Sequence, residues 1–228
     1  MIFASKGRIE SCTAKGWWGS ETLDQLFLSK VASAPHRTAL IDPDNRDEIT
    51  HGKPQRLTYS ELNRKVTEAA EQFIKLGVVK DDIVVFQLPN IHESIVILLA
   101  CSRVGALASP ILVDFADHEL DQILGHVKPK LFVTVNQFKK RDLLAAVKPI
   151  CQKHGVSLVS VEDLDQSFSE SQLEVAEKII ASHQLGHALT ANDVNTICWT
   201  SGTEGFPKAV MRTHNQWMVT GRAMTDSA

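Results

Sequence analysis

The sequence predicts an α/β fold in which parallel sheets are flanked by helices, and three observations lead to this prediction. Segments with apolar residues at helical spacing alternate along the chain with short segments of strand character. The strand segments, such as DIVVFQL and PKLFVTV, are continuous apolar runs, which is typical of sheets buried on both faces. Because helices separate consecutive strands, right-handed crossovers and mostly parallel pairing are expected.

The composition is that of an ordinary globular protein. Of its 228 residues, 43% are hydrophobic and 22% are charged, which suffices to build a core. A net charge of -3 excludes a strong field that would recruit nucleic acid or an anionic membrane. The 4 cysteines lack the paired spacing of a disulfide framework or a zinc site, and neither a secretory signal nor a membrane-length apolar run is visible. We therefore expect a cytoplasmic protein with reduced thiols, no nucleic-acid partner and no transmembrane segment.

The first half of the chain alternates between the two kinds of segment. The expected elements are a helix over 20–35, a strand over 38–42, a polar turn region over 42–54 that leads to 55–59, a helix over 60–77, a strand over 82–88, a helix over 90–105, and over 106–112 a strand that ends in a proline break. Ser20 and Ser60 are the predicted N-caps of the first two helices, and Gly77 is expected to end the second.

The second half continues the alternation and then becomes polar. A helix over 117–127, a strand over 129–135, a helix over 138–155 with an internal proline, and a strand over 156–161 are expected. The first α/β subdomain is predicted to span 1–190, including a polar surface connection at about 162–191. Residues 192–228 are predicted to begin a second subdomain with a strand, a loop, a strand and a helix that starts at His214 or Asn215.

The segment TSGTEGFPK, from Thr200 to Lys208, has the chemistry of an anion-binding loop. Gly202 and Gly205 allow the backbone to come close to a ligand, and the loop amides can form an anion-binding concavity. Hydroxyl groups are supplied by Thr200, Ser201 and Thr203. Lys208 adds a positive charge.

The spacing S-G-x-x-G-x-P-K differs from the strand–loop–helix motif G-x-x-x-x-G-K-S/T. Its proline predicts an extended exit from the loop rather than a helix. A Gly/Ser/Thr loop that merely turns the chain is the alternative, and Lys208 argues against it.

The longer segment WTSGTEGFPKAVMRTHNQ resembles the phosphate-loop signature of the adenylate-forming superfamily of acyl-CoA synthetases, adenylation domains and luciferases. That signature is usually Y-T-S-G-T-T-G-x-P-K-G-V followed by T-H. The segments LTYSELNRKVTEAAEQFIKLGVVKDDIVVFQLPN and ACSRVGALASPILVDFADHELDQILGHVKPKLFVT are similar to the family's opening helix and strand and to its next segment. The resemblance runs from about Trp17 to the last residue and is weakest in the polar connection.

The resemblance implies a two-step reaction. ATP and a small-molecule carboxylic acid form an acyl-adenylate and pyrophosphate, and the acyl group then passes to a thiol, usually that of coenzyme A. By matched position, the ATP phosphate-binding residues would be Thr200, Ser201, Gly202, Thr203, Glu204, Gly205 and Lys208. Thr200 would also supply a hydroxyl ligand to Mg²⁺. His214, Asn215 and Thr220 match the stretch that lines the acyl pocket in aryl-acid members. For His214, the cap of the last helix is an equally weighted alternative.

Three positions depart from the family pattern. Trp199 stands where Tyr is usual, Ala209 where Gly is usual, and Glu204 where Thr is commonest. An ionised carboxylate about 5 Å from one phosphate charge costs about 3 kcal/mol at an effective dielectric constant near 20. We therefore predict that Glu204→Thr tightens the binding of ATP or pyrophosphate in a complete protein. Unchanged or weaker binding in calorimetry would identify Glu204 as a benign family variant.

Cys198, beside the loop, invites interpretation as a nucleophile. Its strand position and the lack of a neighbouring general base favour a buried thiol instead.

The chain is shorter than half of a typical family member, and the resemblance places the family's adenine pocket and catalytic lysine after residue 228. We therefore expect an N-terminal portion of an ATP-dependent carboxylic acid–CoA ligase that forms no acyl-adenylate by itself. Fatty, alicyclic or aromatic acids are slightly favoured as substrates, which would place the ligase in fatty acid metabolism or a related route. The alternatives are an aryl-acid or amino-acid adenylation enzyme that loads a carrier protein, and a non-catalytic truncated paralogue. The sequence is also compatible with a homodimer.

Overall fold

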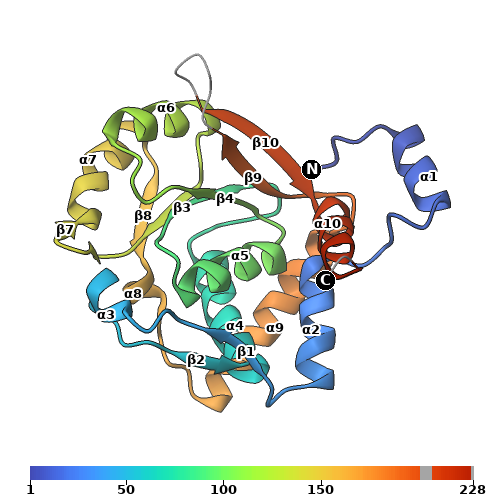
Figure 1. Cartoon of the computed structure of the whole chain (residues 1–228), viewed down its shortest axis with the longest axis horizontal. Coiled ribbons are helices and arrows are strands. Elements are labelled where there is room, and N and C mark those ends of the chain that lie inside the picture. Colours follow the sequence, from blue (N-terminus) through green and yellow to red (C-terminus); the bar gives the residue numbers. More distant parts are fainter. Residues whose placement is uncertain (201–206, 227–228) are drawn as a thin grey trace.

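The computed structural model describes residues 1–200 and 207–226, and a six-stranded sheet organises them (Figure 1). In spatial order its strands are β10 (Lys208–Thr213), β9 (Val194–Thr200), β4 (Leu107–Ile111), β3 (Ile83–Gln87), β5 (Leu131–Thr134) and β8 (Ser157–Ser160). β10 is antiparallel to β9, and every other pair in this sheet is parallel. The predicted fold class is confirmed, with β10 as an antiparallel edge strand.

Two small strand pairs and the helices complete the described chain. β1 (Thr38–Ile41) pairs antiparallel with β2 (Arg56–Thr58), and β6 (Gln137–Phe138) pairs antiparallel with β7 (Arg141–Asp142). The helices are α1 (Lys6–Ala14), α2 (Leu23–Ser33), α3 (Arg46–Ile49), α4 (Tyr59–Lys75), α5 (His92–Val104), α6 (Asp117–Val127), α7 (Leu143–His154), α8 (Val161–Leu164), α9 (Glu170–Gly186) and α10 (His214–Asp226).

The helices form two layers around the sheet. α4 packs against α2, α5 and α9, whereas α6 and α7 pack against each other (Figure 1). After β3 the chain passes through α5 to β4 and then returns across β3 to β5, so the direction of the connections reverses at β3. With right-handed crossovers, that reversal places the helices of successive connections on opposite faces.

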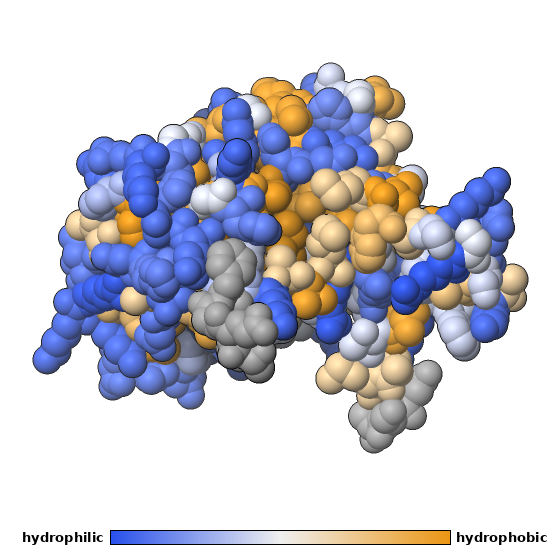
Figure 2. Space-filling model, turned by 90° about the horizontal axis from the view of Figure 1, so that it is seen from above, coloured by the Kyte–Doolittle hydropathy of each residue, from blue (hydrophilic) through white to orange (hydrophobic). Residues whose placement is uncertain are grey.

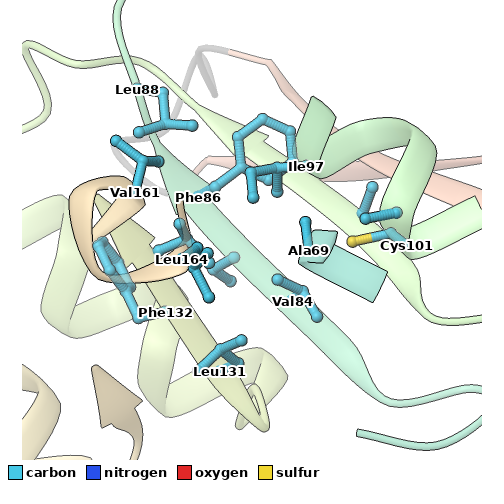
Figure 3. Packing of buried hydrophobic residues seen from close by; sticks show 14 of the residues in the cluster. Ala69, Val84, Phe86, Leu88, Ile97, Cys101, Leu131, Phe132, Val161 and Leu164 are labelled. Carbon is cyan, nitrogen blue, oxygen red and sulfur yellow. The ribbon is translucent and has the colours of Figure 1, made fainter. Parts of the chain in front are cut away.

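The core lies on both sides of β3 and β5, which explains their continuous apolar sequences. Val84 and Val85 are both completely buried, although neighbouring side chains of a strand point to opposite faces. Figure 3 shows the side chains of these strands meeting residues of α4, α5 and α8, among them Ala69, Ile97 and Leu164. Both faces of the sheet therefore need apolar side chains, as the sequence predicted.

Helix α4 begins two residues earlier than its predicted cap would allow. Thr58, not Ser60, is the N-cap, and a reciprocal pair of hydrogen bonds with Glu61 forms a capping box. Likewise Thr22, not Ser20, caps α2 through a capping box with Gln25. In both cases a Glu or Gln three residues further on selects the cap, so the spacing decides between neighbouring hydroxyl residues.

Two other expectations are corrected. The run FKKRD, expected to open a helix, forms the β6–β7 hairpin, and α7 begins after it with Asp142 as its N-cap. Pro110, expected to end a strand, lies inside β4 opposite Phe86 of β3. On its other side, β4 pairs with β9 where Ala108 lies opposite Thr196. Pro110 lies beyond this pair, where its missing N–H is tolerated.

The predicted polar connection contains a packed helix. α9 places Ala176 and Ile180 in buried positions and lies against α4 and α5. β9 and β10 extend the same sheet as the earlier strands, and the division into subdomains near residue 190 stays a prediction.

A buried arginine joins three helices. Arg103 on α5 donates hydrogen bonds to Asp24 of α2 at 3.0 Å and to Thr67 and Asn63 of α4, each at 2.9 Å. A buried charge is stable only when it is paired in this way, so the cluster fixes how the three helices meet. Within the described part of the chain, no helix combines the length and the apolar character that a membrane crossing requires.

The face of the molecule over β10 carries an apolar band. Figure 2 looks down on this face and shows apolar residues gathered across it. Large apolar side chains exposed by β10 and by the segment after β4 are Val210 (40%), Met211 (39%) and Leu112 (66%).

Candidate functional site

The candidate site lies at the carboxyl end of β9, where the chain turns back into β10. Thr200 is the last residue of β9, Lys208 is the first of β10, and the two are paired across the strands. The other predicted phosphate-binding residues lie outside the described residues: Ser201, Gly202, Thr203, Glu204 and Gly205. The two residues that flank the predicted loop therefore face each other at its base.

Both flanking residues are open to solvent. The Thr200 hydroxyl donates to the carbonyl oxygen of Lys208 at 3.5 Å, which is the long limit of a hydrogen bond. An accessible hydroxyl oxygen is a ligand type that Mg²⁺ accepts, and an accessible ammonium suits a phosphate. The chemistry at the base of the loop thus fits a magnesium nucleotide.

Two tryptophans hold the strands that carry the loop. The indole N–H of Trp199 donates to the Ser109 hydroxyl of β4 at 2.9 Å. The indole N–H of Trp217 on α10 donates to the Thr196 hydroxyl of β9 at 2.8 Å, and the Arg212 guanidinium lies 5.1 Å from the ring centre of Trp217. β9 is therefore tied to β4 on one side and to α10 on the other.

His214 and Asn215 are buried at the start of α10 and contact the first residue of α2 and the segment before it. The backbone N–H of Leu23 donates to His214 Nδ1 at 3.2 Å. Asn215 accepts from the Gly19 N–H at 2.9 Å and donates to the Gly19 carbonyl at 3.1 Å. Burial lowers the pKa of His214 to about 4, despite the attraction of Asp193, so the imidazole is neutral at pH 7.

The structure does not bring the three predicted acyl-pocket residues onto one surface. His214 and Asn215 point into the protein, whereas Thr220 is exposed and its hydroxyl donates to the Gln216 carbonyl one turn earlier. Among the three, Thr220 alone is accessible to a ligand in the described structure.

Asp193, immediately before β9, was not singled out from the sequence. Its carboxylate accepts from the Met1 ammonium at 2.7 Å, from Lys80 at 3.1 Å and from the Thr190 hydroxyl at 2.9 Å. Burial alone would raise the pKa of Asp193, but these hydrogen bonds lower it to about 2. The T-x-x-D spacing of Thr190 and Asp193 was the signal available in the sequence.

A second polar cluster also escaped the sequence analysis. Arg46 of α3 donates to Asp42 at 2.5 Å, contacts His92 Nδ1 at 2.6 Å and forms an ion pair with Glu93. The cluster borders a cavity of about 430 Å³ near the carboxyl ends of β5 and β8. Asp42, His92 and Glu93 have the donor atoms of a metal site, but the guanidinium among them already supplies the positive charge.

The chain matches one known protein family over most of its length. The model of the family described as AMP-binding enzyme matches residues 27–227. The chain belongs to the AMP-binding enzyme family. The matched region contains every element of the sheet and the loop between β9 and β10.

Curated AMP-binding relatives include named CoA ligases. The medium-chain fatty-acid–CoA ligase of Escherichia coli is 29% identical over 212 residues, which cover 92% of this chain and 36% of the ligase. The mitochondrial acyl-CoA synthetase short-chain family member 3 of Rattus norvegicus is 32% identical over 180 residues, which cover 68% of this chain and 25% of that protein. This chain thus spans about a quarter to a third of the length of these relatives.

Solved structures share the fold. Apo MbtA of Mycobacterium smegmatis gives a TM-score of 0.72 at 23% identity, over 96% of this chain and 38% of that one. VinN in complex with 3-methylaspartate gives 0.69 at 18% identity, over 92% of this chain and 52% of that one. The mostly parallel sheet with its helices is therefore the architecture of the N-terminal part of AMP-binding enzymes.

Proposed function

We propose that the chain is the nucleotide-handling, N-terminal portion of an ATP-dependent carboxylic acid–CoA ligase. Such an enzyme forms an acyl-adenylate and pyrophosphate from ATP and the acid, and then an acyl-CoA thioester. The observation that supports this most directly is the pairing of Thr200 with Lys208 at the base of the loop, in a chain whose residues 27–227 match the AMP-binding family.

In this proposal the loop holds the β- and γ-phosphates of ATP. Its backbone amides and the hydroxyls of Ser201 and Thr203 donate hydrogen bonds, while Gly202 and Gly205 permit close approach. Lys208 contributes a positive charge from the β10 side, and Thr200 offers its hydroxyl from the β9 side. The Thr200 hydroxyl would hold Mg²⁺, and the ion would supply positive charge that offsets the charge of the pyrophosphate.

We propose different roles for the three α10 residues. His214 and Asn215 hold the segment from Gly19 to Leu23 against α10, so they would position the pocket rather than touch the acid. Thr220, which is exposed, is the residue of the three that we propose to line the acyl pocket.

The proposal also specifies the thiol that accepts the acyl group and the class of acid. Both curated relatives described above are named for CoA chemistry, and one for medium-chain fatty acids, which favours coenzyme A and a fatty or related acid. The reduced-thiol composition favours the cytoplasm, although the rat relative is named mitochondrial.

Two other functions share the same loop. An aryl-acid or amino-acid adenylation enzyme that loads a carrier protein is kept because VinN, a structural neighbour, was solved with the amino acid 3-methylaspartate. The other is a non-catalytic paralogue, which would share the loop without the reaction.

A chimera tests the proposal. Residues 1–228 would replace the corresponding part of the E. coli ligase, and ATP–pyrophosphate exchange would be measured with a panel of fatty, aromatic and amino acids. We expect acid-dependent exchange by the chimera, about a hundredfold less with Lys208→Gln, and none by the chain alone. A chimera that is folded, as judged by circular dichroism, but shows no exchange would contradict nucleotide handling by this chain. Exchange by the chain alone contradicts its expected inactivity.

The alternatives separate at the second step. In the longest native protein that contains this sequence, thioester formation with free coenzyme A supports the ligase. Loading of a carrier protein alone supports the adenylation enzyme.

A further inference from the structure

The cavity of about 430 Å³ beside Arg46 lies outside the carboxyl ends of β5 and β8, and we call it the Glu68 cavity. The helices that follow β3 and β5, α5 and α7, belong to different layers, and crevices at such points of open α/β sheets are the usual place for ligands. Its floor is apolar, and Figure 3 shows four of the side chains that form it. The floor consists of Ala69, Val96, Ile97, Val135, Val161 and Leu164.

One buried carboxylate borders this cavity with an oxygen free. Glu68 of α4 is 3% exposed and lines the cavity. Its Oε1 accepts from the Phe168 N–H at 3.0 Å and lies 3.6 Å from Arg64 Nε. Its Oε2 hydrogen-bonds to none of the residues that the structure describes but, unlike the fully enclosed hydroxyl of Ser102, retains accessible surface. Because Glu68 lines the cavity, this oxygen opens into it.

The two cations that attract Glu68 both have other partners. Arg64 donates to Glu170 at 2.6 Å and also to the Phe168 carbonyl. Lys65 pairs with Asp165 at 3.3 Å. Burial raises the pKa of Glu68, and the nearby Asp165 charge adds to this rise. A further cation at Oε2 would therefore stabilise the charged form of Glu68.

The charges of the lining select the chemistry of the occupant. Glu162 and Asp165, which follow β8, border the cavity together with Glu68, so a carboxylate or phosphate would meet like charges there. A metal ion needs several oxygen ligands, and Glu68 offers one free oxygen. An ammonium group has three N–H donors and no acceptor, which suits carboxylate oxygens.

The basic residues of the lining do not reverse this balance. The Arg46 charge is compensated by Asp42 and Glu93, and Lys53 is exposed to solvent. A cation with an apolar body therefore fits both the free carboxylate oxygen and the apolar floor.

We propose that the Glu68 cavity binds a small molecule that carries a primary amine on an apolar ring. The ammonium donates to Glu68 Oε2, the Asp165 charge adds attraction, and the ring packs against Ile97 and Leu164. β4 and β3 lie between β9 and β5, a span of about 14 Å across the sheet, so this site is separate from the proposed nucleotide site. It does not depend on the proposed function.

Titration of the full 228-residue chain with phenethylamine, followed by NMR of the backbone amides, tests the proposal. Phenethyl alcohol and phenylacetate are the matched ligands, because they keep the ring and replace the ammonium by a neutral and by an anionic group. We expect phenethylamine to bind at least about tenfold more tightly than either. Equal affinities for the three ligands, or no saturable shift at the amides of Glu68, Ala69 and Leu164 up to the solubility limit of the amine, would overturn the proposal.

Variants test the carboxylate. Glu68→Gln keeps the shape and the acceptor for the Phe168 N–H but removes the charge, and should remove the preference for the amine. Glu177→Gln makes the same change at an exposed position of α9 and should leave the affinity for phenethylamine unchanged. If Glu68→Gln binds phenethylamine as wild type does, the proposal fails. Should that variant not fold, the exposed Asp165→Asn takes its place with an expected threefold or larger loss, and an unchanged affinity there counts against the proposal equally.

Discussion

Gly52 has no side chain because Arg46 occupies the space that one would need. A Cβ built on Gly52 would lie 2.7 Å from Arg46 Nε, and the guanidinium cannot easily move because Asp42, His92 and Glu93 hold it. We expect Gly52→Ala to lower the free energy of unfolding by about 1–3 kcal/mol, measured by urea denaturation.

Gly186→Ala is the matched control for that substitution. Gly186 ends α9 and has no neighbouring atom within 4 Å of a built Cβ, so we expect a change within about 0.5 kcal/mol. Equal stability of the two variants would show that Arg46 is not held in place by its three partners.

His214 should make folding sensitive to acid. Its pKa is lowered from 6.5 to about 4 in the folded protein, so between these values the unfolded chain binds a proton that the folded chain does not. The stability contribution is fully present above pH 6.5, falls as the pH drops, and reaches a loss of about 3 kcal/mol near pH 4. Asn at position 214 retains an acceptor near Nδ1 without titrating, so His214→Asn should remove this slope from urea-unfolding measurements between pH 7 and pH 4.

A second substitution at the same helix end separates titration from lost structure. Gln216 accepts from the Thr213 N–H at 2.8 Å, and Gln216→Ala removes this cap without removing an ionisable group. We expect lower stability at every pH with the wild-type slope. A slope that persists in His214→Asn would mean that another group is responsible.

At the residue scale, the sequence predicted what lies at the loop but not what surrounds it. Thr200 and Lys208 were recognisable because hydroxyl, glycine and lysine residues occur together in one short segment. Asp193 and Arg46 were not, because each depends on contacts between segments far apart in the chain. The caps of α2 and α4 were misplaced by two residues because Ser and Thr near a helix start are equivalent until the Glu or Gln partner is considered.

At the element scale, β10 is the exposed edge of the sheet. Within the described residues its outer side pairs with no strand, and Val210 and Met211 are 40% and 39% exposed. Unpaired apolar edges promote association between chains, and a lysine on the edge opposes it. We expect Val210→Lys to weaken concentration-dependent self-association of the wild-type chain in analytical ultracentrifugation.

Val175 provides the control for the edge strand. It is 54% exposed on α9, so Val175→Lys adds the same charge elsewhere on the surface. A wild-type chain that stays monomeric at high concentration, or an equal effect of the two substitutions, would contradict association through β10.

Local sequence pattern predicted correctly those strands whose residues are buried on both faces. Continuous apolar runs correctly predicted β3 and β5. The pattern marked the amphipathic stretch LEVAEKIIASH, which lies in α9, but not the packing of that helix against α4 and α5. It failed at the β6–β7 hairpin, whose strands have two residues each. Strands that short carry no periodicity to detect.

At the scale of the whole molecule, the described residues form a six-stranded sheet that carries the β9–β10 loop, and the chain spans 36% of the length of the E. coli ligase. The sheet buries its own core, so the base of the loop is formed by Thr200 and Lys208 without any further segment. The order of the strands could not be predicted from sequence, because the reversal at β3 depends on packing between distant segments. The spacing of elements did predict the parallel layout.

Calorimetric titration of the full chain with pyrophosphate and Mg²⁺ tests the nucleotide loop most directly. We expect saturable binding that Lys208→Gln weakens at least about tenfold, or 1.4 kcal/mol. Lys178→Gln, an exposed lysine on α9, should bind as wild type does. Binding that is absent, or that Lys208→Gln leaves unchanged, would contradict the assignment of the β9–β10 loop to nucleotide phosphates.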